Sequence, residues 1–248
     1  MKVLAVAALV AGVLLGCGQK SAQQSELAGV QIIGKDDRVL TDRTDFPFGA
    51  VGMLRSQWSK GEWSMCTGVL VGKFIALTNR HCVFDNQNKD AMAKLIQFYP
   101  AYRKESAPGY STVVSIIAPE TYAYRNDWAI IRFEEPVGEW FGFMTPDANY
   151  QGTGTTRPLL YLLGFSGEFF MKYGGPHLEI GCNIIAERYG ILSHDCDMRP
   201  GASGSPLFYN DGRLLGLNSH EYRHIQKNNA VAASEFVQAI ADANAKYP

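Results

Sequence analysis

Short apolar runs separated by turn residues follow one another along most of the chain. From about residue 31 to residue 190 they occupy the ranges 50–54, 68–71, 74–78, 113–117, 129–133 and 159–163. Their lengths, their β-branched residues and their Gly, Pro, Asn and Asp boundaries favour strands over helices. The pattern therefore predicts an all-β protein, built as a barrel or a sandwich.

Helical spacing is clear only near the C-terminus. Ser234 is placed to cap a helix there, and one face of that helix would carry Phe236, Val237, Ile240 and Ala241. The stretch Asp90 to Lys94 is compatible with one further helical turn. Turn-forming residues gather in the range 146–157, where we expect the boundary between two β lobes, about 31–145 and 146–248.

The first residues are typical of a bacterial export signal. Met1-Lys2 and the apolar run Val3 to Gly16 have the charged start and small-residue end of a signal peptide. Because Leu14-Leu15-Gly16-Cys17 resembles a lipobox, we expect cleavage to leave a lipidated Cys17, within a leader of residues 1–17. The alternative is plain secretion, in which Cys17 leaves with the signal peptide. Residues 18–30, polar and rich in Gln, Ser and Ala, are typical of a tether or a removable pro-segment.

Composition narrows the class of partner. The chain has 248 residues, 46% hydrophobic and 19% charged, which is ordinary for a globular protein. Its 23 basic and 24 acidic residues are spread along the sequence and give a formal net charge of −1. No nucleic-acid partner is expected from this balance, and a membrane contact is expected only through Cys17.

The cysteine count agrees with export. Of five cysteines, removing Cys17 leaves the even set Cys66, Cys82, Cys182 and Cys196. Disulfides are the default in an oxidising compartment, and three pairings of this set stay open. A metal site in the run His194 to Asp197 has no matching second pair of ligands, so we expect neither a metal nor another cofactor.

Three stretches carry candidate chemistry. His81 follows an apolar strand and precedes a cysteine, Asp127 opens another apolar strand, and Ser203 lies in a turn of small residues. Each alone has a structural explanation, as a hydrogen-bonding residue, a strand-start cap or a Gly/Ser turn. Together they provide a nucleophile, a base and a carboxylate that orients the base.

The serine turn has a further property. Small residues on both sides of Ser203 allow a tight backbone turn, which a strand at Leu207-Phe208 then supports. The N–H groups of Gly201 and Ser203 are therefore candidates for an oxyanion hole.

The chain order His, Asp, Ser is that of the chymotrypsin-like serine peptidases, and the local sequences resemble theirs over roughly residues 31–248. Thr78-Asn79-Arg80-His81-Cys82 is similar to the family's Thr-Ala-Ala-His-Cys. Asn126-Asp127-Trp128-Ala129-Ile130-Ile131 is similar to Asn-Asp-Ile-Ala-Leu-Leu, and Gly201-Ala202-Ser203-Gly204-Ser205-Pro206 to Gly-Asp-Ser-Gly-Gly-Pro. The bacterial glutamyl endopeptidases are the branch that Gly34 to Arg38 and the Ser-Gly-Ser-Pro run resemble most.

This resemblance implies two antiparallel Greek-key β-barrels with a C-terminal α-helix. It implies a monomeric serine endopeptidase acting on proteins or peptides, with His81 as general base, Asp127 orienting it and Ser203 as nucleophile. It also implies a bridge between Cys66 and Cys82 and, with it, one between Cys182 and Cys196. Ala202 departs from the family pattern, since the animal enzymes have there the aspartate that receives the new N-terminus on zymogen activation.

The resemblance offers three candidate substrate-binding residues. Asp197 lies six residues before Ser203, as does the aspartate at the bottom of trypsin's pocket. A loop carboxylate paired with Arg199 is the alternative interpretation. Asn218 stands where the glutamyl enzymes have a pocket histidine, and His220 follows two residues later.

Two other classes of protein share features with this sequence. An α/β-hydrolase requires Gly-x-Ser-x-Gly and a following aspartate and histidine, but too few residues follow Ser203 for that fold. The rival from another class is a catalytically silent binding lipoprotein on the same fold. In either case the expected location is outside the cytoplasm, as a periplasmic or outer-membrane lipoprotein or as a secreted bacterial protein.

Overall fold

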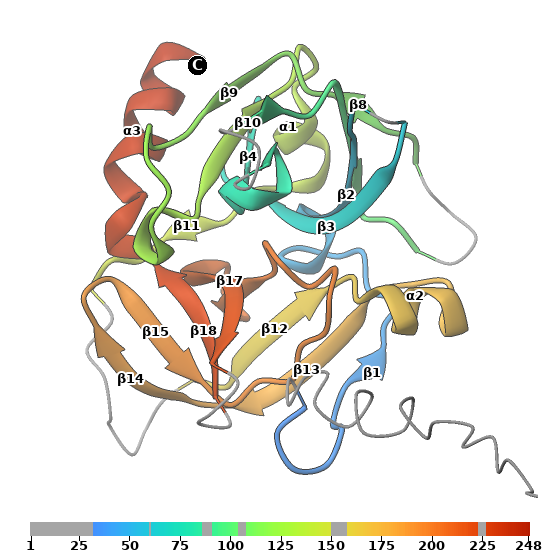
Figure 1. Ribbon diagram of the computed structural model, residues 1–248, viewed down its shortest axis with the longest axis vertical. Coiled ribbons are helices and arrows are strands. Elements are labelled where there is room, and N and C mark those ends of the chain that lie inside the picture. The colour runs from blue at the N-terminus through green and yellow to red at the C-terminus, as the bar shows by residue number, and fades with distance from the viewer. Residues whose placement is uncertain (1–31, 60, 86–90, 104–107, 150–157, 223–226) are drawn as a thin grey trace, which may run out of the picture.

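The computed structural model describes residues 32–59, 61–85, 91–103, 108–149, 158–222 and 227–248. The leader, the tether, Asp90 and part of the expected lobe boundary lie outside these ranges. The described chain is mostly β, with two antiparallel sheets that each curl into a half-barrel, one above the other in Figure 1. A helix follows at the C-terminal end. The expected all-β fold of two barrels and a C-terminal helix is confirmed.

The first sheet has seven strands in the order β8-β7-β2-β3-β4-β10-β9. Its bounds are β2 (Val51–Gln57), β3 (Trp63–Leu70), β4 (Ile75–Thr78), β7 (Leu95–Pro100), β8 (Ser111–Thr112), β9 (Ser115–Ile117) and β10 (Ala129–Arg132). Five of the predicted apolar runs form strands of this sheet. The alternating burial of β7 and the complete burial of β4 follow from one face, or both, lying against the core.

The second sheet is built mainly from the later part of the chain, in the order β1-β13-β12-β16-β17-β18-β15-β14. Its strands are β1 (Val39–Leu40), β11 (Thr145–Pro146), β12 (Leu160–Gly164), β13 (His177–Cys182), β14 (Ile184–Arg188), β15 (Ile191–His194), β16 (Pro206–Tyr209), β17 (Arg213–Tyr222) and β18 (Lys227–Ala232). Strand β11 pairs in parallel with β17. Strand β1 precedes the first sheet in sequence yet pairs with β13, so the N-terminal segment crosses to the second lobe.

Short helices connect the strands. Single 3₁₀ turns are η1 (Phe48–Ala50), η2 (Arg80–Cys82), η3 (Tyr124–Asn126) and η4 (Ala233–Glu235), and the α-helices are α1 (Val137–Phe141), α2 (Gly167–Tyr173) and α3 (Val237–Lys246). The sequence analysis missed α1 and α2, because five to seven residues are too few to show a helical period. Among the described residues, none of the helices has the length and apolar content needed to cross a membrane.

Two helical predictions were wrong in detail. Ser234 lies in η4 and does not cap α3, which begins after Phe236 without a side-chain cap. Ala241 is exposed, whereas Phe236, Ile240 and Ala243 are buried, because the face that packs on the core is a narrow i, i+4, i+7 stripe that leaves Ala241 beside it. Residues 91 and 92 form strand β6 (Ala91–Met92) instead of a helical turn, since they pair with β5 (Phe84–Asp85) in a hairpin.

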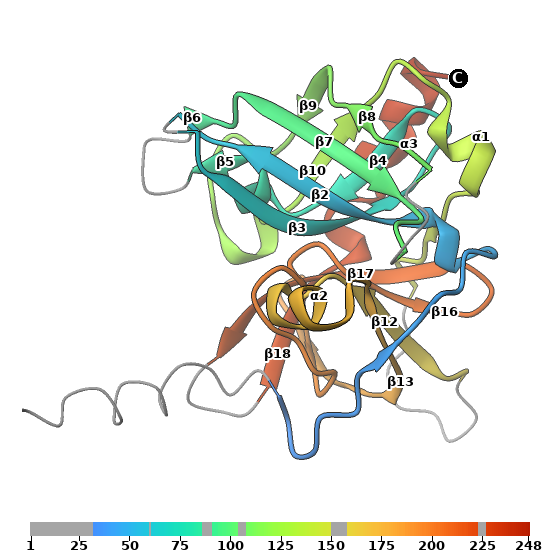
Figure 2. The same ribbon diagram turned by 90° about the vertical axis from the view of Figure 1, so that its right-hand side faces the viewer.

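The hydrophobic core fixes the ends of the strands that carry the candidate residues. Leu77 on β4 and Ile130 and Ile131 on β10 are almost completely buried, and the two strands pair directly. Figure 2 shows β3 of the first sheet facing the second sheet, with α2 beside the junction. His81 follows β4 and Asp127 precedes β10.

Candidate active site

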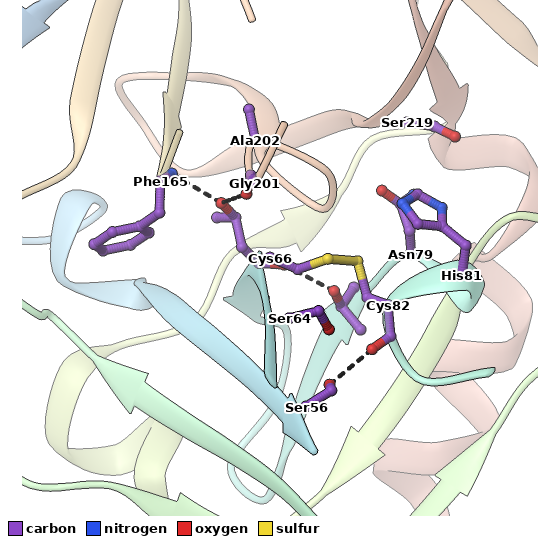
Figure 3. The surroundings of a disulfide bond; sticks show 12 residues. Ser56, Ser64, Cys66, Asn79, His81, Cys82, Phe165, Gly201, Ala202 and Ser219 are labelled. Carbon is purple, nitrogen blue, oxygen red and sulfur yellow. Dashed lines mark hydrogen bonds between the residues drawn. A yellow bond between two sulfur atoms is a disulfide. The ribbon is translucent and has the colours of Figure 1, made fainter. Parts of the chain in front are cut away.

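His81 is held in η2, the 3₁₀ turn that follows β4. Asn79 is buried in front of this turn, and its side-chain amide donates to the carbonyl oxygen of Asp127 at 2.7 Å. Behind the turn, Cys82 is bridged to Cys66 on β3, and the Ser56 hydroxyl donates to the Cys82 carbonyl oxygen at 2.7 Å, as Figure 3 shows. These contacts restrict the backbone on both sides of His81.

Asp127 precedes β10 and its side chain is fully buried. One carboxylate oxygen accepts the His81 backbone N–H at 3.0 Å, and the other lies 2.7 Å from His81 Nδ1. A carboxylate on this ring nitrogen selects the tautomer with the proton on Nδ1, which leaves Nε2 as the proton acceptor. About a third of the His81 side chain is exposed, so the imidazole is anchored on one edge and accessible elsewhere.

The electrostatics of this pair stabilise the protonated imidazole of His81 and the ionised carboxylate of Asp127. Burial lowers the pKa of His81, but the charge of Asp127 and the hydrogen bond to it outweigh burial, so the pKa is raised. For Asp127, burial acts to raise the pKa, yet His81 and the hydrogen bonds from His81 and Ser219 hold it below its usual value. The carboxylate therefore stays ionised and stabilises an imidazolium.

Ser219 on β17 is a member of the site that the sequence analysis missed. Its hydroxyl donates to Asp127 Oδ2 at 2.5 Å and is buried. The only signal in the sequence was its place between two residues already singled out, Asn218 and His220. A serine within an apolar strand has too many other uses to be recognised without the contact.

Ser203 lies in the turn between Arg199 and β16. The turn is fixed to the first sheet through Thr67 on β3, whose N–H donates to the Ser203 carbonyl oxygen at 2.8 Å. The Thr67 hydroxyl donates to the Gly201 carbonyl oxygen at 3.1 Å and accepts the Phe165 N–H at 2.9 Å. Thr67 therefore connects the serine turn with both lobes.

The backbone of the turn requires glycine on both sides of Ser203. Gly201 and Gly204 have φ angles of 103° and 84°, a region that L-residues with a side chain rarely adopt. A Cβ at Gly204 would also collide with the Thr67 carbonyl oxygen. The small-residue pattern around Ser203 thus reflects a steric requirement.

Two N–H groups of the turn have no acceptor among the described residues. The N–H groups of Ala202, Gly204 and Ser205 donate to backbone carbonyl oxygens, whereas those of Gly201 and Ser203 do not. These are the two donors that the sequence analysis predicted for an oxyanion hole. Two N–H donors without an internal acceptor are suited to hydrogen-bond a carbonyl oxygen on which negative charge develops.

Of the three sequence-predicted triad residues, His81 and Asp127 are in direct contact, and the turn of Ser203 is bound to β3 through Thr67. Cys66 directly precedes Thr67, which binds the serine turn, and the Cys66 sulfur lies within 4.8 Å of the Cys82 sulfur and a His81 ring nitrogen. The segments that carry Ser203 and His81 are therefore both tied to neighbouring residues of β3, Thr67 and Cys66. Neither the Ser203 hydroxyl nor His81 Nε2 has a hydrogen-bond partner in the described part of the chain.

The candidate substrate-binding residues Asp197 and Asn218 are both engaged within the protein. Asp197 is buried and accepts the N–H groups of Ile33 at 2.7 Å and Asp37 at 3.1 Å, so its carboxylate holds the N-terminal segment. Asn218 is fully buried, donates to the Ala202 carbonyl oxygen at 2.9 Å and lies 3.1 Å from His194 Nε2. It supports the serine turn from behind.

His220 continues the hydrogen-bonded line through Asp127. Its Nδ1 lies 2.9 Å from the Ser219 hydroxyl. Because that hydroxyl donates to Asp127, the His220 Nδ1 must carry the proton and donate to Ser219. The His220 ring stacks on Tyr124 with the ring centroids 4.1 Å apart. Burial lowers the pKa of His220, which keeps this ring neutral.

Both expected disulfides are present, Cys66–Cys82 and Cys182–Cys196. They also bear on metal binding. Among the described residues, the cluster of potential metal ligands is His81 with Cys66 and Cys82, but the two sulfurs are bonded to each other and offer no thiolate. In the run His194 to Asp197, Cys196 is likewise bridged.

Comparisons with known proteins identify the family of the chain. A family profile described as the trypsin-like peptidase domain matches residues 66–217. Exfoliative toxin A of Staphylococcus aureus is 28% identical over 80% of this chain and 71% of its own length. Glutamyl endopeptidase of Staphylococcus aureus (strain MRSA252) is 25% identical over 82% of this chain and 56% of its own length.

One solved structure, a Glu endopeptidase in complex with MPD, superposes with a TM-score of 0.74 at 22% identity. The match covers 86% of this chain and 99% of that one. At this identity the likeness concerns the fold alone. The match to the family profile covers more than half of the sequence, and the chain belongs to the trypsin-like peptidase family.

Proposed function

We propose that the protein is a serine endopeptidase that hydrolyses peptide bonds with Ser203, His81 and Asp127. The observation that carries the proposal is the pair of hydrogen bonds from His81 to the buried Asp127. They leave Nε2 free to accept a proton, and the turn of Ser203 is bound through Thr67 to the strand whose Cys66 is bridged beside His81. Trypsin-like peptidases act on proteins or peptides, and family membership supports the same substrate class here.

In this mechanism the Ser203 hydroxyl oxygen attacks the carbonyl carbon of the peptide while its proton passes to His81 Nε2. The imidazolium is stabilised by Asp127, and the carbonyl oxygen accepts hydrogen bonds from the N–H groups of Gly201 and Ser203. His81 then gives the proton to the leaving amine. A water molecule hydrolyses the acyl-enzyme by the same route and regenerates Ser203.

The topology also supports binding of an extended peptide. Strand β16 pairs with β17 only as far as Leu217, whereas β18 continues along β17 to Tyr222. No other described strand pairs with the free edge of β17 beyond Asn218. Since this edge starts beside the serine turn, a substrate strand can pair with it and bring its scissile bond to Ser203.

Labelling with a fluorophosphonate probe tests the proposal. We expect the probe to label the wild-type protein and not Ser203→Ala. Ser205→Ala is the matched control, because this neighbouring serine is buried and its labelling should equal that of the wild type. If neither the wild type nor the control is labelled, the protein is the catalytically silent binder and the peptidase proposal fails.

We further propose that the chain is exported and lipidated at Cys17. The leader sequence supports this part of the proposal. Cells fed a radiolabelled fatty acid should label the wild-type protein and not Cys17→Ser. Equal absence of label in an exported, shortened protein would instead indicate plain secretion.

A further inference from the structure

A cavity of about 600 Å³ lies between η3 of the first lobe and three strands of the second lobe. It is close to the candidate active site, because its lining residue Tyr124 stacks on His220. One wall comes from η3 and the residue before it, the other from strands β14, β15 and β18, which lie side by side in Figure 1. Its lining residues are Ala123, Tyr124, Arg125, Ala186, Arg188, Tyr189, Ile191, Ser193, Lys227 and Asn229. A volume of this size accommodates one or two amino-acid side chains.

The charged residues that line the described part of the cavity are all basic. Arg125, Arg188 and Lys227 line it, and none of the lining residues that the structure describes is acidic. Among the described side chains no carboxylate forms an ion pair with any of these three cations. Cations that converge on a hollow without an internal partner raise the local positive potential, which attracts an anionic group.

The remaining walls suit a polypeptide better than a bare ion. Tyr189 is 90% exposed and has a φ of 52° at the turn after β14, so an aromatic ring stands at the rim. Tyr124 forms another part of the wall. The Ser193 hydroxyl donates to the Asn229 side-chain oxygen at 3.0 Å on the sheet side. Aromatic and polar groups in one hollow are typical of contacts with peptide.

The cavity also lies along the proposed path of the substrate. Tyr124 precedes Asp127 by three residues and stacks on His220. On the sheet side, Asn229 and Lys227 of β18 pair with His220 and Tyr222 of β17. The part of β17 one to three residues beyond Ser219 therefore lies next to the cavity, paired with β18 on one edge and without a described strand on the other.

We propose that this cavity is a substrate subsite that selects an acidic side chain, Asp or Glu, in the polypeptide being cleaved. The inference rests on the proposed peptidase function. From the rise of a strand, the selected residue lies roughly two to four positions from the scissile bond. The subsite would select substrates by the charge of a side chain, which the catalytic residues themselves do not do.

Paired peptides test the subsite. The residue at the cleaved bond is first fixed with a peptide library, and the neighbouring positions on each side are then changed singly from Gln to Glu. We expect kcat/KM to be higher with Glu at one position on one side, and the Glu/Gln ratio to fall roughly 2- to 5-fold in Arg125→Gln, Arg188→Gln and Lys227→Gln. The ratio should also fall as salt is raised.

Charge reversal provides a stronger readout. Arg188→Glu should lower the Glu/Gln ratio further and favour a Lys peptide at the same position. Lys246→Gln is the matched control, since it removes one exposed cation from the C-terminal end of α3 and should leave the ratio unchanged.

Two failures are distinguishable. Cleavage of all peptides with equal kcat/KM for Glu and Gln at every position overturns the subsite and leaves the peptidase function standing. Absence of cleavage and of fluorophosphonate labelling overturns the function itself. Binding of the Glu and Gln peptides to Ser203→Ala then reports on the cavity without catalysis, and equal affinities overturn the subsite.

Discussion

Asp127 determines both the position and the charge of His81. Its two oxygens hold the backbone and the ring of the same residue, and Ser219 adds a third hydrogen bond. A buried carboxylate with three donors has little freedom to rotate or to become protonated. At the residue scale, the proposed catalytic power therefore depends on a group that never touches the substrate.

This arrangement predicts the pH dependence of hydrolysis. Because the pKa of His81 is raised, kcat/KM should rise with pH around a midpoint above the usual histidine value of about 6.5. Asp127→Asn removes the negative charge, so the midpoint should move to lower pH and the rate should fall on the order of 10⁴-fold, the loss known for this change in a serine protease triad. Initial rates across pH 5 to 9 measure both.

Asp242→Asn, an exposed change on α3, is the control and should keep the wild-type profile. An Asp127→Asn profile with an unshifted midpoint would contradict the coupling between the two residues.

At the scale of elements, two fixed segments support the candidate site. They are the loop from Cys66 to Cys82 and the segment around Asp197. The disulfide closes a loop with a sequence separation of 16 and ties η2 to β3. On the other lobe, Asp197 holds the N-terminal segment, and its own N–H donates to Glu179 at 2.6 Å. The disulfide and these hydrogen bonds each restrict a loop that strand pairing alone does not fix.

Removing the Cys66–Cys82 disulfide should lower both the stability and the activity of the protein. We expect the double variant Cys66→Ala/Cys82→Ala to lose about 3 kcal/mol of unfolding free energy, because the loop closure no longer restricts the unfolded chain. Urea unfolding measures this loss. Cys182→Ala/Cys196→Ala is a matched comparison, since its loop has a sequence separation of 14. The first variant should lose more activity per folded molecule, and equal losses would contradict a role in positioning His81.

Glu179 should make stability depend on pH. Burial, with the nearby Asp197, Asp195 and Asp37 charges, raises the pKa of Glu179 to about 8. The folded state thus keeps a proton that the unfolded state loses near its ordinary pKa of 4.5. The stability from this group is present below about pH 4.5 and is lost as pH rises towards 8.

We therefore expect Tm to fall between pH 5 and 9 more steeply in the wild type than in Glu179→Gln, which is neutral throughout. Glu187→Gln changes an exposed residue of β14 and should keep the wild-type slope. Identical slopes in all three proteins would show that Glu179 titrates normally. Circular dichroism melts give the values.

At the scale of the whole molecule, the site exists only where the two sheets meet. His81 and Asp127 come from the first lobe, and Ser203 and Ser219 from the second. Thr67 on β3 connects them, since it is completely buried and hydrogen-bonds to the serine turn and to Phe165. In the proposed mechanism, catalysis therefore depends on the relative position of the two lobes.

Thr67→Val tests this connection with little change in shape. The substitution leaves the Gly201 carbonyl and the Phe165 N–H without their partner, so we expect a loss of roughly 2–4 kcal/mol in unfolding free energy and a lower kcat. Thr67→Ser should retain most of both. Thr112→Val, an exposed threonine of β8, is the control. Wild-type kcat in a folded Thr67→Val protein would exclude the connection from catalysis.

The sequence by itself determined the strand-rich fold class, the order of the three candidate catalytic residues and the small-residue turn at Ser203. Those features are local, since strand periodicity, a residue at a strand end and glycine at positive φ each depend on a few neighbouring positions. The roles of Ser219, Thr67 and Asn79 depended on contacts between distant segments, and so did the use of Asp197 by the N-terminal segment. Only the tertiary structure decided these, because hydrogen bonds across the lobe junction and a cavity lined by three separate strands leave no periodic trace in the chain.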